Sequence, residues 1–356
     1  MADYSDFGSP CEDWLNLTRD NAIVPPVPLL QTREQSRAFR AAGNEARYRA
    51  SKEALSKLGG LGVSIQTVSI LCRDFQEIGA RIYRPSPSAS SRETTAASLQ
   101  DGDSCKVLLY FHGGGFLSGS LSTEDALCVQ LANHGNVVVI SVNYRHTPEW
   151  TYPTQFDDAW AARCQILHEP QTLGLPPNIA LYVAGISSGA NLAASLTVRE
   201  RITDDVKIKG QALWMPWLCH PDSFPTHAIV SPEKSSPIQC RDAPLLSYSL
   251  VQAFAEMLQV DENGISDMIV NPLLCSGTVL ERMPPTHILV CGNDPLRDHG
   301  MLFADKLDSA GVPVRSEIYP GLPHGFGRIN GLKSNKAWDN DMDEGLQWLL
   351  QSHHKL

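Results

Sequence analysis

The sequence predicts an α/β protein in which a mostly parallel, eight-stranded sheet is covered by helices on both faces. Eight short stretches have the length and composition expected of strands. The middle runs are continuously apolar, as in parallel strands buried on both faces. Segments of helical length, such as 122–134 and 188–201, separate them, which is typical of alternating strands and helices. The expected strands are 67–72, 80–85, 106–111, 137–142, 179–184, 211–216, 287–292 and 314–319.

Length and charge narrow the class of protein further. The chain has 356 residues and 42% hydrophobic content, which suffices for a large buried core with insertions. Its formal net charge is −10, and its Lys and Arg residues form no cluster interleaved with aromatic residues. A nucleic-acid or anionic-membrane partner is therefore not expected. The expected partner is a small molecule.

Three segments fall outside the alternation of strands and helices. A small, polar stretch predicts a disordered loop, an Ala- and Arg-rich stretch before the first strand predicts a long helix, and a Pro-rich insertion contains an apolar helix. These segments are 88–104, 33–58 and 220–270, with the inserted helix at 244–258. The two helices could form a cap, although 244–258 could instead be another helix that covers the sheet. The expected division is an N-terminal cap segment 1–60, a first core part 61–219, a cap insertion 220–270 and a second core part 271–356.

A short stretch after the fifth expected strand indicates nucleophilic chemistry. Residues 183–191 read VAGISSGAN, so a G-x-S-x-G pattern follows a buried strand and opens a helix. The pattern alone could be only a tight Gly-Ser turn. In this setting it matches the nucleophile elbow of α/β-hydrolases, where a strained turn lifts a serine above the sheet. Ser187 is the candidate nucleophile, and the backbone N–H of Ser188 can face a developing oxyanion.

A serine nucleophile needs a base, a group that orients the base, and donors for the oxyanion. Residues 112–116 read HGGGF and directly follow a strand, so three glycines let backbone N–H groups approach a substrate. Asp294 and His324 each follow a later strand, at the sheet edge where ligands of α/β sheets bind. The chain order Ser187, Asp294, His324 is the order of the template. Together these residues predict a Ser-His-Asp hydrolase.

The motifs together resemble a known family. HGGGF, NYRHTPE (143–149), GISSGAN, DPLRD (294–298) and HGF (324–326) occur in order over roughly 105–330. This set is similar to the hormone-sensitive-lipase-like family of carboxylesterases. The resemblance implies an α/β-hydrolase fold with a helical cap. For the site it implies that Ser187 is the nucleophile, His324 the base and Asp294 the carboxylate that orients the base. It also implies that the oxyanion donors are Gly114, Gly115 and Ser188. The residues that support this loop are His112 and Gly113.

This chain departs from the family pattern around the nucleophile. The family usually has Asp before the serine and Ala-Gly-Gly after it, whereas here Ile186 precedes it and Ser188, Gly189 and Ala190 follow. A backbone donor survives a change of side chain, so the Ser188 N–H can still serve. The changes put the turn geometry and the optimal rate in question, not the assignment of Ser187.

The expected function is that of a serine carboxylesterase acting on a small, fairly apolar ester through an acyl-enzyme. A faint similarity to fungal secondary-metabolite esterases suggests a polyketide or other secondary-metabolite acetate or lactone. Relatives that act as cyclases or dehydratases, and a receptor-like binding module, are the alternatives; retention of His324 argues against a receptor. The candidate pocket walls, each of which could equally be core packing, are Phe116, Trp217, Phe254, Met257 and Phe326.

No cofactor or metal is expected. The 11 histidines lack ligand spacing, and the nine cysteines are odd in number, contain no C-x-x-C pair and are expected to be reduced packing residues. No apolar run approaches the ~20 residues that span a bilayer. The acidic N-terminal stretch lacks the features of a secretory signal. The protein is therefore expected to be cytoplasmic, as a monomer or homodimer.

Overall fold

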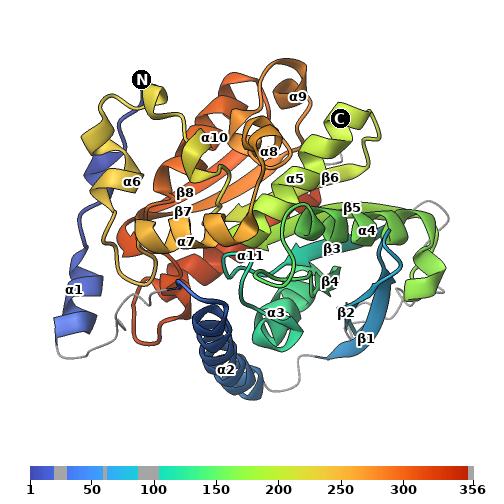
Figure 1. The fold of residues 1–356 in the computed structure, drawn as a ribbon. Helices are drawn as coiled ribbons and strands as arrows, with labels where there is room; N and C mark the ends of the chain where they lie inside the picture. Colours follow the sequence, from blue (N-terminus) through green and yellow to red (C-terminus); the bar gives the residue numbers. More distant parts are fainter. Residues whose placement is uncertain (20–29, 59–61, 87–103, 352–356) are drawn as a thin grey trace.

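A computed structural model describes residues 1–19, 30–58, 62–86 and 104–351 (Figure 1). The strands are β1 (Val63–Leu71), β2 (Glu77–Pro85), β3 (Cys105–Phe111), β4 (Val138–Val142), β5 (Ile179–Ile186), β6 (Ile208–Trp214), β7 (Thr286–Asn293) and β8 (Val314–Pro323). The α-helices are α1 (Glu12–Arg19), α2 (Arg33–Lys57), α3 (Asp125–Gly135), α4 (Thr154–His168), α5 (Ser188–Thr203), α6 (Ser236–Gln239), α7 (Tyr248–Leu258), α8 (Glu262–Ser266), α9 (Gly277–Glu281), α10 (Arg297–Ser309) and α11 (Asn335–Gln351).

The eight strands form one sheet in the order β1-β2-β4-β3-β5-β6-β7-β8. β2 pairs antiparallel with both β1 and β4, and all other pairs are parallel. Each strand overlaps one of the runs predicted from the sequence, so the prediction of a mostly parallel eight-stranded sheet is confirmed. The parallel order brings the carboxyl ends of β3, β5, β7 and β8 to one edge.

Helices cover both faces of the sheet. Successive residues of a strand point to opposite faces, so a continuously apolar strand has apolar side chains to bury on each face. On β3, Leu109 and Phe111 belong to one core, which also contains buried residues of α4, α5 and α10. Leu108 and Tyr110 belong to the opposite core, together with residues of α3 and α11. This explains why β3 reads as a continuous apolar run.

The two helices that the sequence set apart, α2 and α7, contact each other. α2 begins at Thr32, whose side chain accepts a hydrogen bond from the Gln35 N–H in a capping box. The rings of Phe39 on α2 and Phe254 on α7 lie 6.2 Å apart, and the Ser36 hydroxyl donates to the Met257 sulfur. In Figure 1, α2 lies below α7 with its upper end toward it.

The helix predicted at 244–258 is shorter than expected. α7 starts at Tyr248, capped by the Ser247 hydroxyl, which accepts from the Leu250 N–H. Leu245 has a φ of +70°, a left-handed conformation that does not continue a helix. Apolarity alone therefore placed the beginning of this helix too early.

The N-terminal 19 residues lie along the β7–β8 side of the sheet. Ala2 pairs with Ile229, and the Cys11 N–H donates to the Gly321 carbonyl. Of the segment predicted as an N-terminal cap, it is α2 that packs beside α7. Most of the predicted polar loop 88–104 lies outside the described residues.

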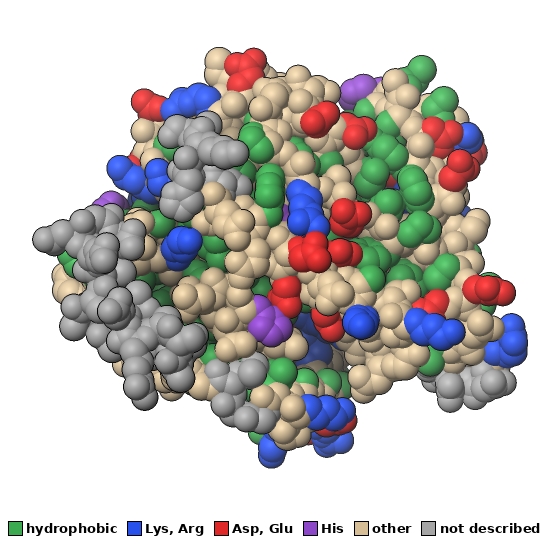
Figure 2. All heavy atoms as spheres, turned by 180° about the vertical axis from the view of Figure 1, so that it is seen from behind, with side chains coloured by type: hydrophobic (Ala, Val, Ile, Leu, Met, Phe, Trp, Pro, Cys, Tyr) green, Lys and Arg blue, Asp and Glu red, His purple; other side chains and the backbone are tan. Residues whose placement is uncertain are grey.

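All nine cysteines are free. In the described ranges, no three His, Cys, Asp or Glu side chains are grouped so that they could hold a metal ion. No helix among the described residues combines the length and apolarity needed to cross a membrane. Figure 2 shows Lys and Arg side chains standing beside Asp and Glu on the rear face, with no large basic patch among its coloured residues.

Candidate active site

Ser187 occupies a strained turn between β5 and α5. Its φ is +57° and its ψ is −118°, a region whose cost for a non-glycine residue is of order 1–3 kcal/mol. Two glycines permit the turn: a Cβ at Gly185 would overlap the Gly189 carbonyl, and one at Gly189 would overlap the Phe111 carbonyl of β3. The helix and the strand are therefore closely packed at this turn, and Ala190 is fully buried there.

The structure brings Ser187, His324 and Asp294 into one hydrogen-bonded chain. The His324 Nε2 lies 3.0 Å from the Ser187 Oγ, and the His324 Nδ1 lies 2.6 Å from the Asp294 Oδ2. Asp294 is 1% exposed, and its other oxygen accepts from the Leu296 N–H at 2.8 Å. This carboxylate is therefore fixed where it can accept the Nδ1 proton, which leaves Nε2 as the acceptor facing the serine hydroxyl.

Residues 112–119, called the oxyanion loop below, pack on the turn that carries Ser187. A Cβ at Gly113 would lie 2.8 Å from the Ile186 carbonyl oxygen and 3.3 Å from the Ser187 Cβ. The Gly114 carbonyl accepts from the N–H groups of Leu117 and Ser118 at 3.1 and 2.9 Å. Because N–H and C=O point in opposite directions in a trans peptide, these bonds fix the direction of the Gly115 N–H.

Three backbone N–H groups at this place are candidate donors to an oxyanion. Among the residues that the structure describes, those of Gly114, Gly115 and Ser188 donate to no loop, cap or side-chain acceptor. Ser188 is the first residue of α5, so its N–H lies at the positive end of the helix dipole. Such unsatisfied donors suit a negative charge that develops during a reaction.

His112 is a structural part of the oxyanion loop. Its ring is fully buried and stacks on Tyr144 with 4.4 Å between centroids, and the Tyr144 hydroxyl donates to its carbonyl at 2.9 Å. Burial, helped by the charge of Arg47, lowers the pKa of His112 to about 4. The imidazole is therefore neutral near pH 7, and its Nδ1 lies 3.1 Å from the Gly113 carbonyl oxygen.

Comparison with known proteins identifies the family of this chain. A family model described as the alpha/beta hydrolase fold matches residues 108–328. The chain belongs to this family. Esterase LipI of Mycobacterium tuberculosis is 34% identical over 70% of this hydrolase and 71% of its own length. The versiconal hemiacetal acetate esterase of Dothistroma septosporum is 30% identical over 67% and 72%. The resemblance to hormone-sensitive-lipase-like carboxylesterases is thus confirmed, and the chain is a hydrolase of an esterase family.

A solved structure described as vibralactone cyclase also has the hydrolase fold found here. It superposes with a TM-score of 0.80 at 25% identity, and the match covers 98% of this chain and 96% of that one. The scaffold of this family therefore also occurs in a protein named for cyclisation.

Four of the five predicted pocket residues of this hydrolase lie on the same side of the sheet as α7. Phe116 and Trp217 have ring centroids 5.5 Å apart and are both buried. A Cβ at Gly115 would overlap the Phe254 ring, so this ring lies directly on the oxyanion loop. Met257 lies one turn away on α7 and contacts Ser36. The structure therefore places these four predicted residues on one side of the sheet, close to the oxyanion loop.

Phe326, the fifth predicted pocket residue, lies on the opposite side of the sheet from the other four. Its fully buried ring packs against Tyr319 and Trp338, with centroids 5.1 and 5.2 Å away, in the core that contains α3 and α11. The prediction of a pocket wall at this position is corrected to core packing. His324 two residues earlier bonds to Ser187, whereas Phe326 packs in the core, so proximity in the sequence did not predict the surroundings of Phe326.

Sequence reasoning missed the polar residues that fasten α2 to the hydrolase core. Asn44 exchanges two hydrogen bonds with the backbone of Gly119, and Arg47 donates to the Gly113 carbonyl and to Glu124. Arg328 donates to the same carboxylate. No local signal could have found these contacts, because the partners are 66 to 204 residues apart.

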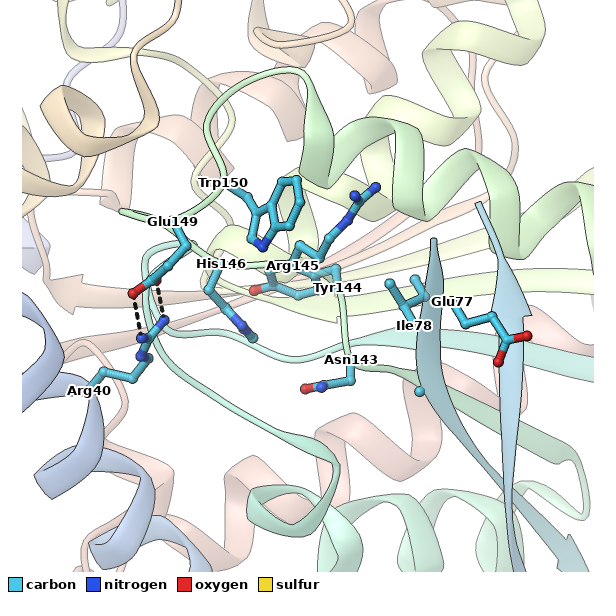
Figure 3. Close-up of a pocket in the computed structure, with 10 residues that line it drawn as sticks. Arg40, Glu77, Ile78, Asn143, Tyr144, Arg145, His146, Glu149 and Trp150 are labelled. Atoms are coloured by element: carbon cyan, nitrogen blue, oxygen red, sulfur yellow. Dashed lines mark hydrogen bonds and ion pairs between the residues drawn. The ribbon is translucent and has the colours of Figure 1, made fainter. Parts of the chain in front are cut away.

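A pocket of about 430 Å³ lies beside residues 143–149 and is drawn in Figure 3. Arg40 reaches into it from α2 and pairs with Glu149, with 2.9 Å between Nη1 and Oε2. Arg145, which also lines the pocket, pairs with Asp158 and Asp74. Both guanidiniums are therefore already neutralised, and no member of the Ser187 chain of hydrogen bonds lines this pocket.

Proposed function

We propose that this hydrolase is a serine carboxylesterase that cleaves a small, fairly apolar ester through an acyl-enzyme. The observation that carries the proposal is the hydrogen-bonded chain from Asp294 through His324 to Ser187, placed on a strained turn. The order and geometry of these groups match the arrangement in which a serine becomes a nucleophile at neutral pH. The esterase names of the relatives support the same class of reaction.

In the first half of the reaction the Ser187 Oγ attacks the ester carbonyl carbon. His324 Nε2 takes the hydroxyl proton, and Asp294 stabilises the resulting imidazolium through Nδ1. The carbonyl oxygen becomes an oxyanion that accepts hydrogen bonds from the N–H groups of Gly114, Gly115 and Ser188. The tetrahedral intermediate then collapses: the bond to the alcohol oxygen breaks, and the alcohol leaves with the proton from His324.

The second half repeats these steps with water. His324 takes a proton from a water molecule, whose oxygen attacks the acyl carbon on Ser187. The same backbone donors hold the second oxyanion, and its collapse releases the acid and returns the proton to the Ser187 Oγ. No cofactor or metal is needed in either half.

The buried aromatic residues around the oxyanion loop support a small, apolar substrate. Phe116, Trp217 and Phe254 are 2–6% exposed, and Ser187 is 7% exposed. The relative from Dothistroma septosporum is named for an acetate ester of a secondary metabolite. We therefore infer an acetate or similarly short acyl ester, of a polyketide or other secondary metabolite, as the substrate class.

A cyclase is the second candidate, favoured by the match to the structure described as vibralactone cyclase. Here a hydroxyl of the substrate itself would replace water and attack the acyl carbon on Ser187, so that a lactone forms instead of an acid. Both reactions need the same triad. A receptor-like module does not, and the complete Ser187–His324–Asp294 chain argues against it.

Substitution of the two adjacent serines tests the proposal. With short-chain aryl esters, Ser187→Ala should lose at least about 10⁴-fold in kcat, because the nucleophile is removed. Ser188→Ala should keep most of the activity, because the proposed donor there is the backbone N–H. Substantial turnover by Ser187→Ala, or loss confined to Ser188→Ala, would reject the assignment. Identifying an acid or a lactone as the product with a hydroxy ester separates the esterase from the cyclase.

A further inference from the structure

A buried carboxylate lies just after the oxyanion loop and takes no part in the triad. The Glu124 side chain is 1% exposed and immediately precedes α3. It accepts from the Arg47 Nη2 at 2.5 Å, the Arg328 Nη2 at 2.9 Å and the Tyr110 hydroxyl at 2.8 Å. Although burial raises the pKa of Glu124, the Arg328 and Arg47 charges lower it to about 2. The carboxylate is therefore ionised and fixed by three donors from separate parts of the chain.

Arg47 makes a second bond with a direct connection to the site. Its Nη1 donates to the Gly113 carbonyl oxygen at 3.1 Å. That carbonyl and the Gly114 N–H belong to one planar trans peptide, so they point in opposite directions. A guanidinium on the oxygen thus fixes the direction in which the Gly114 N–H points. It also withdraws electron density from the peptide, which makes the N–H a stronger donor.

We propose that Arg47, held by Glu124, is a positioning residue that orients the Gly114 N–H toward the oxyanion formed at Ser187. The inference rests on the proposed function, because it assigns Gly114 a role in that reaction. It gives α2 a part in the chemical step beyond covering the substrate.

The same carboxylate also reaches the loop that carries the base. Arg328 ends the 3-10 helix Phe326–Arg328, four residues after His324, and donates to both oxygens of Glu124 at 3.0 and 2.9 Å. Glu124 therefore joins α2, the oxyanion loop and the histidine loop. The planar fork of Arg47 contacts two acceptors at once, which a lysine ammonium on a single flexible stem reproduces poorly.

The test compares Arg47→Met and Arg47→Lys with Arg37→Met. Arg37 lies on the same helix, and its pair with Glu149 is exposed and distant from Gly113 in the hydrogen-bond network. We would measure kcat and KM with p-nitrophenyl acetate, and the rate constant for labelling of Ser187 by a fluorophosphonate. Labelling also places a negative oxygen opposite the oxyanion donors, so it reports on them without knowledge of the natural substrate.

Arg47→Met should lower kcat and the labelling rate together by about 10- to 100-fold, less than or equal to the loss of a whole oxyanion donor. KM should change by less than about 2-fold, because the interaction is made in the transition state. Arg47→Lys should recover part of both rates. Arg37→Met should match the parent. Glu124 keeps Arg328 as a partner in Arg47→Met, which favours folding of the variant.

Parent-like kcat and labelling in a folded Arg47→Met would overturn the inference, as would an effect on KM alone or an equal loss in Arg37→Met. If Arg47→Met melts below the assay temperature, Arg47→Lys decides: unchanged rates in that variant also overturn the inference. Failure of the proposed function would give a different result: the parent enzyme would not be labelled, or it would be labelled at a residue other than Ser187.

Discussion

The two helices that stand beside the oxyanion loop are held in opposite ways. α2 buries only two side chains along its 25 residues, both serines, and most of its contacts described above are polar; Phe39, which packs on Phe254 of α7, is apolar. They run from Arg37 and Arg40 to Glu149, from Asn44 to Gly119 and from Arg47 to Gly113 and Glu124. α7 buries Leu250, Val251, Phe254, Ala255 and Leu258 within 11 residues and is held by apolar packing.

This difference in packing suits the two helices to different tasks: α2 to orienting peptide groups and α7 to shaping the pocket. Hydrogen bonds are directional, so α2 can set the orientation of peptide groups in the oxyanion loop. Apolar contacts follow shape and area, so α7 can set the size of the pocket through Phe254. We therefore expect changes to the α2 side chains that bond the oxyanion loop to alter kcat, and changes to the α7 side chains that face this loop to alter which ester is preferred.

The largest expected effect is the loss of kcat on substitution of Gly115, where the oxyanion loop contacts α7. Gly115 has a φ of +64°, and a Cβ there would overlap the Phe254 ring. Gly115→Ala should lower kcat by about 100-fold or more, because one oxyanion donor is displaced. The double variant with Phe254→Ala should recover part of the loss. Aryl-ester kinetics of the single and double variants provide the measurement.

Gly43→Ala is the matched control for that substitution. Gly43 lies inside α2, and no heavy atom outside its neighbourhood lies within 4 Å of a Cβ placed there. The change should leave kcat unaltered and stabilise the helix by about 0.5–1 kcal/mol. If Gly115→Ala behaved like Gly43→Ala, the Gly115 N–H would have no role as a donor.

A smaller effect is expected from truncation of α7 itself. Phe254→Ala and Met257→Ala should shift relative rates between short and longer acyl groups by roughly tenfold, since one apolar pocket group is worth about 1–3 kcal/mol of discrimination. Phe254→Ala should also cost about 3–5 kcal/mol of stability as a buried truncation. Thermal melting and a series of acyl chain lengths separate the two effects. Leu250→Ala, which truncates another buried residue of α7, is the control for destabilisation alone; an unchanged ranking in Phe254→Ala would make α7 purely structural.

The smallest expected effect is on stability, and it comes from the partly exposed ion pairs that Arg37 and Arg40 of α2 form with Glu149. Burial raises the pKa of Glu149, but hydrogen bonds from Arg40 and Arg37 lower it to about 2. The ionised carboxylate therefore stabilises the fold above its ordinary pKa, about 4.3, and this contribution is lost as the pH falls toward 2. Glu149→Gln should cost about 1 kcal/mol or less at pH 7.

Urea unfolding of the parent and Glu149→Gln at several pH values gives the measurement. The difference in the free energy of unfolding should begin to shrink below about pH 4, near the ordinary carboxyl pKa, and should disappear as the pH falls toward 2. The destabilisation by Phe254→Ala should stay constant over the same range, because no charge is involved. A difference for Glu149→Gln that does not depend on pH would show that the ion pairs do not hold α2.

The strands and the triad could be predicted because their signals are local. Short strand-like stretches, the middle ones continuously apolar, marked all eight strands, and Ser187, Asp294 and His324 each directly follow a strand whose end the topology brings to one edge. Arg47 and Glu124 could not be predicted, because neither belongs to a motif and 77 residues separate them. The choice between pocket wall and core packing was left open for Phe326, because a motif does not say which side chains a neighbouring loop residue meets.

The central claim is that Ser187 carries the acyl group during turnover, and rapid-quench mass spectrometry tests it most directly. The enzyme would be mixed with p-nitrophenyl acetate, quenched with acid within the first turnover and digested for peptide mapping. The account predicts an acetyl group on Ser187, formed in a burst with p-nitrophenol and absent from the Ser187→Ala variant. Acetyl transfer to Ser188 or to another residue, or steady turnover with no acylated serine at any time, would contradict it.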